Sequence, residues 1–353
     1  MHSPADSTAP DDGAATATPC RVAVAGLGRA GLAHAMAAAQ HEGCAVAGFV
    51  EPRADLRRFA RAAGFTAPAE PTLVRLLARG PLDALVVCAP GEARAALAAE
   101  GLSAGLDVLV DGLPAFGAAG AAGLAALPAD VRARLGCASP ALFHPLLRRG
   151  IELFASGALG VPHQVRASVF VSRVFAPGAP PAELDVLDFA VGDLLLLLDR
   201  CLGSVRSVTA SAHRLYGARV DELHAMLSLD NGAEAGLDAS WSVPGYPRAA
   251  LVLEVEGDRG TMIASDDALE ADLTAAGGGF DEGVTRLSLA DVPDPLPFDA
   301  GDASHAFDAF VRARDSGERC PDLDGERAMR VLRTLDALRA SLAAGGAIAP
   351  VNA

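Results

Sequence analysis

Three glycines near the N-terminus have the spacing of a phosphate-binding loop. Gly26, Gly28 and Gly31 form the pattern G-x-G-x-x-G between an apolar run at 21–25 and an alanine-rich stretch. The first glycine permits a tight turn, the second lets the backbone approach a pyrophosphate, and the third lets a helix pack closely on a strand. Free amides at the helix N-terminus then favour an anion. The residues predicted to contact a dinucleotide here are Gly26, Gly28, Arg29, Ala30 and Gly31. The alternative is a vestigial loop with an empty site.

An acidic residue stands where the next predicted strand ends. Glu51 follows the apolar run 44–50. A carboxylate at this place accepts hydrogen bonds from the ribose hydroxyls and repels a 2′-phosphate. We therefore predict NAD as the cofactor, while Arg53, two positions on, keeps NADP possible. Further contacts with the cofactor are predicted at the ends of the following strands, from Ala89, Pro90 and Asp111.

Four polar residues are candidates for acid–base or electrostatic catalysis: Asp111, Arg94, His144 and Asp193. Oxidising an alcohol requires a base for the hydroxyl proton, and a carboxylate or an imidazole can supply it. A guanidinium can stabilise the developing negative charge. Each residue also has a structural alternative. Asp111 could be a helix cap or a ribose contact, Arg94 a solvated helix residue, His144 a helix cap and Asp193 a paired acid.

The chain contains no lysine, so all 29 of its basic residues are arginines. No lysine can therefore act as an acid, a base or a Schiff-base nucleophile. The six cysteines are scattered and form no C-x-x-C pair, which is typical of reduced thiols in a cytoplasmic protein. The sequence shows no spacing of metal ligands, and no metal is expected from it.

The charge of the chain restricts its partners. The formal net charge of −15 at pH 7 argues against nucleic acid and against an anionic membrane. Residues 1–19 lack both a basic region and an apolar core, so we predict a disordered tail and not a signal peptide. The leucine run between Asp193 and Asp199 is expected to be a buried helix and not a membrane span.

Strands alternate with helices in the first part of the chain, over residues 20–142. Buried strands are predicted at 21–25, 44–50, 82–88, 108–110 and 135–137. Helices are predicted after the glycine loop to residue 40, and at 53–63, 71–79, 92–104 and 117–127. This alternation predicts an NAD(P)-binding Rossmann domain with a doubly wound parallel sheet.

The pattern changes from residue 143 onward. Strands are predicted at 163–173, 205–214, 223–230, 234–242, 248–255 and 260–264, and helices at 145–156, 187–202, 303–316 and 325–343. Turn signals between these strands predict an α+β domain over 143–353 with a mostly antiparallel open sheet. Polar and apolar residues alternate in the strand at 205–214, which predicts one covered face. The other face is a candidate interface of a homodimer or homotetramer.

In combination, these motifs resemble the Gfo/Idh/MocA family of oxidoreductases, named after glucose–fructose oxidoreductase, inositol dehydrogenase and MocA. The resemblance covers nearly all of residues 20–346. Its motifs are the glycine loop extended to His34, Cys88-Ala-Pro90, Phe143-His-Pro145, Gly157-Ala-Leu-Gly160, Asp230-Asn-Gly232, Ser240-Trp241 and Glu256-Gly-Asp-Arg-Gly260. The resemblance implies a Rossmann domain that binds NAD(P), a second domain for substrate and oligomerisation, and oxidoreductase activity on a sugar-like small molecule.

The residues that carry this family's proton transfer are replaced here. Gly112 aligns with its catalytic lysine, and Arg94 aligns with a histidine after the third strand. On the helix with the family's D-x-G-x-H-x-x-D pattern, the histidine aligns with Gly192 and the second acid with Leu195. A gap of one residue makes Asp193 a possible substitute. The cofactor half of the site is thus similar to the family's, and the proton-transfer half differs.

Two functions stay open on the sequence. The first is an NAD(P)-dependent oxidoreductase acting on a sugar-like or other biosynthetic small molecule with a non-standard acid or base. The second is a catalytically inactive family member that binds a nucleotide and acts as a scaffold or regulatory subunit. A lyase or hydrolase cycle that retains NAD is a further alternative, and it too would need a base.

Overall fold

The computed structural model describes residues 18–91, 93–172, 185–216, 218–246, 250–292 and 301–352. Almost all of the tail predicted at 1–19 lies outside these residues. So do the last residue of the strand predicted at 163–173 and the first two residues of the strand predicted at 248–255.

The first sheet has six parallel strands in the order β3-β2-β1-β4-β5-β6. The strands are β1 (Cys20–Ala25), β2 (Cys44–Val50), β3 (Ala69–Glu70), β4 (Ala84–Val87), β5 (Asp107–Asp111) and β6 (Leu135–Ala138). The predicted Rossmann fold is confirmed, with the short edge strand β3 as an addition. Because the strand order reverses between β1 and β4, a ligand site is expected at the carboxyl ends of these two strands.

Short helices connect the strands of this sheet. They are α1 (Arg29–Gln40), α2 (Ala54–Ala62), α3 (Leu73–Leu77), α4 (Ala93–Ser103), α5 (Ala122–Ala125) and α6 (Ala129–Arg132). The helix predicted at 71–79 is shorter than expected. The helix predicted at 117–127 is wrong in its extent, because a 3₁₀ turn at Ala119–Ala121 precedes the four-residue α5. Gly120 and Gly123 weaken the helical preference of this alanine-rich segment.

The second sheet has nine strands in the order β14-β13-β12-β11-β7-β10-β9-β8-β15. Its neighbours are antiparallel except for the parallel pair of β7 and β10, so the predicted mostly antiparallel sheet is confirmed. The strands are β7 (Pro162–Phe170), β8 (Val205–His213), β9 (Glu222–Leu229), β10 (Glu234–Ser240), β11 (Ala250–Gly257), β12 (Gly260–Ser265), β13 (Ala268–Leu273), β14 (Gly283–Ser288) and β15 (Ala349–Pro350). The last three were not predicted, since β13 is rich in residues of low strand preference and β15 has two residues.

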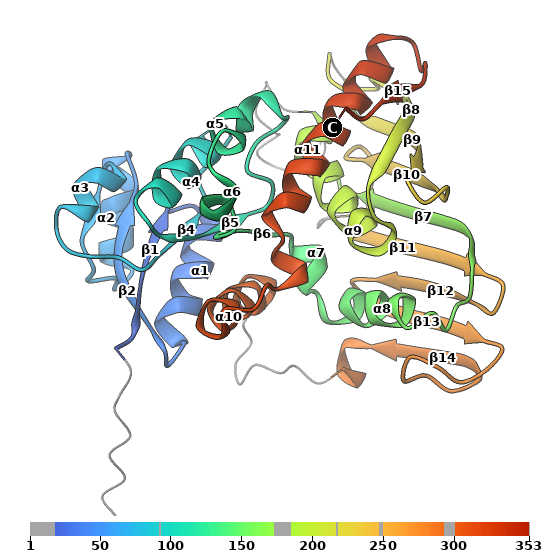
Figure 1. Ribbon diagram of the computed structural model, residues 1–353, viewed down its shortest axis with the longest axis horizontal. Coiled ribbons are helices and arrows are strands. Elements are labelled where there is room, and N and C mark those ends of the chain that lie inside the picture. The colour runs from blue at the N-terminus through green and yellow to red at the C-terminus, as the bar shows by residue number, and fades with distance from the viewer. Residues whose placement is uncertain are drawn as a thin grey trace, which may run out of the picture.

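Helices pack on one face of the second sheet (Figure 1). α8 (Pro145–Ala155) contacts β12 and β13, α9 (Gly192–Leu202) contacts β7, and α11 (Gly325–Ala343) contacts β8. The short α7 (Pro140–Phe143) joins the two sheets. The alternation expected in β8 is present, with Val208 and Ala210 buried and Ser211 and His213 exposed.

The C-terminal helices return to the first sheet. α10 (Gly301–Ser316) packs against α1, and α11 contacts β6 as well as β8 and α9. The cores of the two sheets are therefore continuous through α7, α9 and α11. The domain boundary between residues 142 and 143 stays a prediction.

Candidate functional site

The glycine loop lies between the end of β1 and the start of α1, at the point where the strand order reverses. Gly26 has φ +92°, and a Cβ there would lie 2.8 Å from the backbone carbonyl of Cys88. A Cβ on Gly31 would lie 1.8 Å from the carbonyl oxygen of Gly26, so both positions require glycine. Beside Gly28, by contrast, there is open space to at least 4 Å. This is the arrangement that close approach of a pyrophosphate requires.

The first turn of α1 offers free backbone amides to this space. Gly28 is the N-cap of the helix and no side chain caps it. Arg29 is exposed and Ala30 is half-buried at the mouth of the loop. An uncapped helix N-terminus with partial positive charge favours binding of an anion such as a phosphate.

Glu51 braces the glycine loop from the end of β2. Its Oε2 accepts a hydrogen bond from the Leu27 amide at 3.0 Å, and its Oε1 accepts one from the Arg53 amide at 2.9 Å. The residue is only 5% exposed. Each carboxylate oxygen keeps a further lone pair that can accept another hydrogen bond. The Arg53 side chain turns away to Asp55, which it meets at 2.6 Å.

Arg94 joins the loops that follow β4 and β5. Its Nε donates to the Ala89 carbonyl at 2.8 Å, and its Nη1 donates to the Leu113 carbonyl at 3.1 Å. The alternative of a solvated helix residue is therefore wrong for Arg94. Ala89 is buried in this loop and Pro90 is exposed at its tip.

Gly112 has a backbone that disfavours any side chain. Its φ is +82°, and a Cβ there would lie 3.2 Å from Nη1 of Arg94. A lysine at this place would adopt a strained left-handed conformation. The guanidinium of Arg94 thus fills the volume beside the position where the family carries its lysine.

Asp193 lies at the start of α9 and is held by a residue from the first sheet. Ser139, fully buried after β6, donates its hydroxyl to Oδ1 of Asp193 at 2.7 Å. Burial raises the pKa of the Asp193 carboxyl to about 6, with a smaller contribution in the same direction from the charge of Asp111. The Ser139 hydrogen bond and the charge of Arg94 act in the opposite direction. The sequence analysis did not single out Ser139, which as the N-cap of α7 would be expected to cap that helix and does not.

A π-helical turn at Leu187–Val191 precedes α9. Such a turn holds one residue more than an α-helical turn and shifts the side chains that follow. Gly192 is thereby placed against Leu113, since a Cβ there would lie 2.7 Å from the Leu113 Cδ1. Asp188, at the N-terminal end of the same turn, is paired with Arg339 at 2.5 Å.

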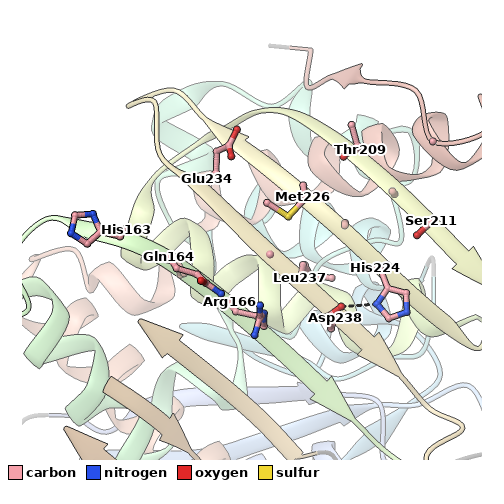
Figure 2. A pocket seen from close by; sticks show the side chains of 15 residues that line it. His163, Gln164, Arg166, Thr209, Ser211, His224, Met226, Glu234, Leu237 and Asp238 are labelled. Atoms are coloured by element: carbon pink, nitrogen blue, oxygen red, sulfur yellow. Dashed lines mark hydrogen bonds and ion pairs between the residues drawn. The ribbon is translucent and has the colours of Figure 1, made fainter. Parts of the chain in front are cut away.

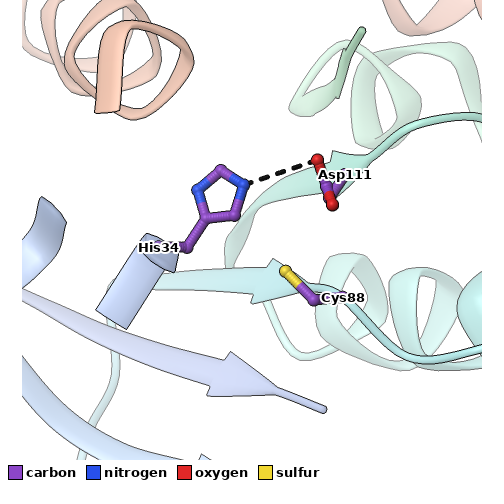
Figure 3. A group of neighbouring side chains, drawn as sticks. All are labelled: His34, Cys88 and Asp111. Atoms are coloured by element: carbon purple, nitrogen blue, oxygen red, sulfur yellow. Dashed lines mark ion pairs between the residues drawn. The ribbon is translucent and has the colours of Figure 1, made fainter. Parts of the chain in front are cut away.

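His144 and Asp111 differ in their surroundings. His144 is the N-cap residue of α8, as its helix-cap alternative has it, but its side chain makes no capping bond, and its Nδ1 is buried without a hydrogen-bond partner among the described residues. Asp111 ends β5 and faces the buried His34, whose Nε2 lies 3.6 Å from Asp111 Oδ1 (Figure 3). Asp111 is therefore not a helix cap.

Residues 20–112, which include the glycine loop, Glu51 and Asp111, match the Gfo/Idh/MocA family, described as an oxidoreductase family with an NAD-binding Rossmann fold. This part of the chain therefore has the NAD-binding Rossmann fold of that family. The cofactor of the family is accordingly NAD(P), as the glycine loop predicts.

Known proteins of the same fold cover nearly the whole chain. D-xylose 1-dehydrogenase (NADP(+)) 2 of Haloferax volcanii is 27% identical over 341 residues, which are 92% of this chain and 97% of that protein. GenD2 from gentamicin A biosynthesis, solved in complex with NAD, is 25% identical with a TM-score of 0.72, over 98% of this chain and 100% of the other. Levoglucosan dehydrogenase in complex with NADH has a TM-score of 0.82 at 16% identity, over 95% of this chain and 100% of the other.

The likeness in fold to levoglucosan dehydrogenase covers both sheets. Among the described residues, no helix combines the length and the apolarity that crossing a membrane requires.

Proposed function

We propose that this chain is an NAD(P)-dependent dehydrogenase of a sugar-like alcohol in which Asp193 is the general base and Arg94 the stabilising cation. The observation that carries the proposal is the half-buried Asp193 carboxyl, which accepts a hydrogen bond from Ser139 and has its pKa raised to about 6. A general base is most effective when its pKa lies near the working pH. The pKa of most aspartates is too low for this role, and burial raises the pKa of Asp193 toward the working pH.

The position of Asp193 supports its role as a substitute base. The π-helical turn before α9 holds one residue more than an α-helical turn, which supports the one-residue gap that makes Asp193 a substitute for the family's residue aligned with Gly192. Leu113 fills the space in which a side chain at 192 would lie. A histidine at 192 would clash with Leu113, whereas the carboxyl at 193 meets Ser139 from the opposite domain.

Arg94 supports the proposal as a source of positive charge. Two backbone carbonyls fix its Nε and Nη1, at 2.8 Å and 3.1 Å. A guanidinium fixed before the reaction stabilises a developing alkoxide without reorganisation. Its charge also lowers the pKa of Asp193, an effect smaller than that of burial.

The cofactor half of the site fits a dinucleotide. The open space at Gly28 and the uncapped amides of α1 would hold the pyrophosphate, and Glu51 would meet the adenosine ribose. NAD(P)⁺ supplies the hydride acceptor for the alcohol carbon when it is bound. Asp193 takes the hydroxyl proton in the same oxidation, so that the products are a ketone or lactone, NAD(P)H and one proton.

The substrate class is proposed from the relatives. Their names refer to xylose, levoglucosan and gentamicin A, which are a sugar, an anhydrosugar and an aminoglycoside. We therefore expect a secondary alcohol on a sugar ring. Asp111 and His144 stay candidates for cofactor contact and proton relay.

The experiment has two stages. NADH and NADPH are titrated into the full chain while the melting temperature and nicotinamide fluorescence are followed, and binding of at least one of them is expected. Sugars, anhydrosugars, amino sugars and the matching ketones are then assayed with the cofactor that binds. Turnover is expected, and Asp193→Asn should reduce kcat by about 10²–10⁴-fold.

Asp267→Asn is the matched control, because the Asp267 carboxylate is exposed in the turn between β12 and β13. It should leave kcat unchanged. Full activity of Asp193→Asn would overturn the assignment of the base. Cofactor binding without turnover on any of these substrates would favour the scaffold alternative, and absence of cofactor binding would contradict both.

A further inference from the structure

Three potential metal ligands from separate elements lie close together at the carboxyl ends of strands in the first sheet. They are His34 on α1, Cys88 directly after β4 and Asp111 at the end of β5 (Figure 3). One ligand atom from each lies within 4.8 Å of the other two. They are far apart in the sequence, so no spacing of ligands along the chain could indicate them.

The imidazole of His34 has no hydrogen-bond partner among the described residues. It is 0% exposed, and neither Nδ1 nor Nε2 forms a hydrogen bond. Its Nε2 lies 3.6 Å from Oδ1 of Asp111, which is beyond hydrogen-bond distance. A buried imidazole that lacks a hydrogen bond and has only this longer contact with a carboxylate is well suited to a bound ion as its partner.

The separation of the ligand atoms suits a tetrahedral ion. Zinc bonds to histidine nitrogen, carboxylate oxygen and thiolate sulfur are about 2.0–2.3 Å long, so neighbouring ligand atoms in a tetrahedron lie roughly 3.3–3.8 Å apart. The 3.6 Å between His34 and Asp111 falls within this range. We propose that His34, Cys88 and Asp111 form a binding site for Zn²⁺, with a fourth position left for water or another ligand.

The chemistry of the three groups favours zinc over magnesium or calcium. One nitrogen, one sulfur and one oxygen form a ligand set of intermediate softness, whereas Mg²⁺ and Ca²⁺ prefer oxygen alone. A thiolate and a carboxylate would balance the double positive charge of the ion. A thiol binds zinc as a thiolate, so binding would release a proton from Cys88 to solvent.

The site is reachable and separate from the proposed base. The Asp111 side chain is 25% exposed, while the His34 side chain is fully buried. Asp193 and Arg94 take no part in it. Metal binding can therefore be measured whether or not the dehydrogenase proposal holds.

The test uses Co²⁺ as a spectroscopic probe on the full-length chain after dialysis against a chelator. One equivalent of Co²⁺ should bind and produce a thiolate-to-Co²⁺ charge-transfer band in the near ultraviolet, together with visible bands of tetrahedral intensity. One equivalent of Zn²⁺ should abolish both. Cys88→Ser should lose the charge-transfer band, and Asp111→Asn should weaken Co²⁺ binding by roughly tenfold or more.

Cys320→Ser is the matched control, because Cys320 is a partly buried free thiol next to the 3₁₀ turn Pro321–Leu323. It should keep the full charge-transfer band. Melting curves establish that each variant is folded before titration. The proposal is overturned if the native chain shows no charge-transfer band at one equivalent, or if Cys88→Ser retains the band of the native chain.

Discussion

At the scale of single residues, the proposed chemistry depends on a few groups whose neighbours change their properties. Asp193 is an ordinary aspartate in sequence, but burial beside Ser139 gives it a pKa of about 6. Arg94 is one of many arginines, but two carbonyl acceptors fix it next to Gly112. Ser139 lies 54 positions from Asp193, and Leu113 lies 19 positions from Arg94. Each effect leads to a measurable expectation.

The pH dependence of turnover should follow Asp193. In the oxidative direction the base must be ionised, so kcat/KM should rise as the pH increases through about 6. Asp193→Asn should remove this inflection and lower the rate at every pH. The measurement is the pH profile of both proteins under saturating cofactor, and an unchanged inflection in the variant would assign the titration to another group.

The same pKa predicts a pH dependence of stability. The carboxyl has a pKa near 3.9 when unfolded and about 6 when folded, so between these values the folded state binds more protons. The free energy of unfolding should therefore fall as the pH rises from about 4 to about 6. Asp193→Asn should flatten this slope, as measured by urea unfolding at a series of pH values. An identical slope in the two proteins would show that Asp193 does not titrate in this range.

Glu51 should determine the preference between cofactors. Its carboxylate is fixed by the amides of Leu27 and Arg53 and would repel a 2′-phosphate, while Asp55 holds the side chain of Arg53 away. We expect NADH to bind more tightly than NADPH, by a factor on the order of ten, which is about 1.4 kcal/mol. Fluorescence titration of both cofactors measures this ratio. Equal affinities would mean that Arg53 leaves Asp55 to bind the phosphate.

At the scale of elements, the two halves of the site are held in place by helices that link the sheets. α9 carries Asp193 and packs against α11, which also contacts β6 of the first sheet. The centre of this contact is Asp199, which is 6% exposed and accepts hydrogen bonds from Arg327 at 3.0 Å and from Arg330 at 2.8 Å and 3.2 Å. The position of the proposed base thus depends on a buried ionic contact outside the site.

Asp199→Ala should destabilise the protein strongly. The buried Arg327 and the half-buried Arg330 would lose this carboxylate, and breaking a buried ionic contact costs about 3–5 kcal/mol. Asp322→Ala is the control, because Asp322 pairs with Arg200 at 2.8 Å in a more exposed setting and should cost about 1 kcal/mol or less. Both values follow from chemical unfolding curves. Equal losses in the two variants would contradict the central role of Asp199.

At the scale of the whole molecule, the second sheet has one face packed with helices and one that bears exposed side chains. The hollow on the exposed face is lined by strands β7, β8, β9 and β10 (Figure 2). Met226 is 50% exposed there, and His224 pairs with Asp238 at 2.6 Å. This mixture of apolar and polar groups suits contact with a second copy of the chain, as the sequence pattern predicts.

A dimer or tetramer formed through this face should be detectable by light scattering. The molar mass is expected to be two or four times the 35.7 kDa of the chain. Met226→Asp places a charge in the contact and should reduce the mass toward that of one chain. Phe59→Asp is the control, since Phe59 is 55% exposed on α2, outside the second sheet. A monomeric native chain would refute the interface.

Local sequence determined the cofactor half of this protein. Gly26, Gly28 and Gly31 follow a buried strand and open a helix, and backbone sterics leave few alternatives for such a segment. The alternation of strand and helix patterns likewise determined both sheets, because hydrophobic periodicity reflects which face of each element is buried. The strands β3, β13, β14 and β15 were not predicted, since they are short or polar and show little hydrophobic periodicity.

Only the tertiary structure decided which groups surround one another in the proposed proton-transfer half of the site. The contacts of Asp193 with Ser139, of Arg94 with Leu113 and of His34 with Asp111 join residues from different strands and helices. A pKa depends on burial and on charges that chain folding brings near, and neither is a property of local sequence. The missing lysine could be read from the chain. Which groups surround the position of that lysine depends on how the strand ends meet in the folded chain.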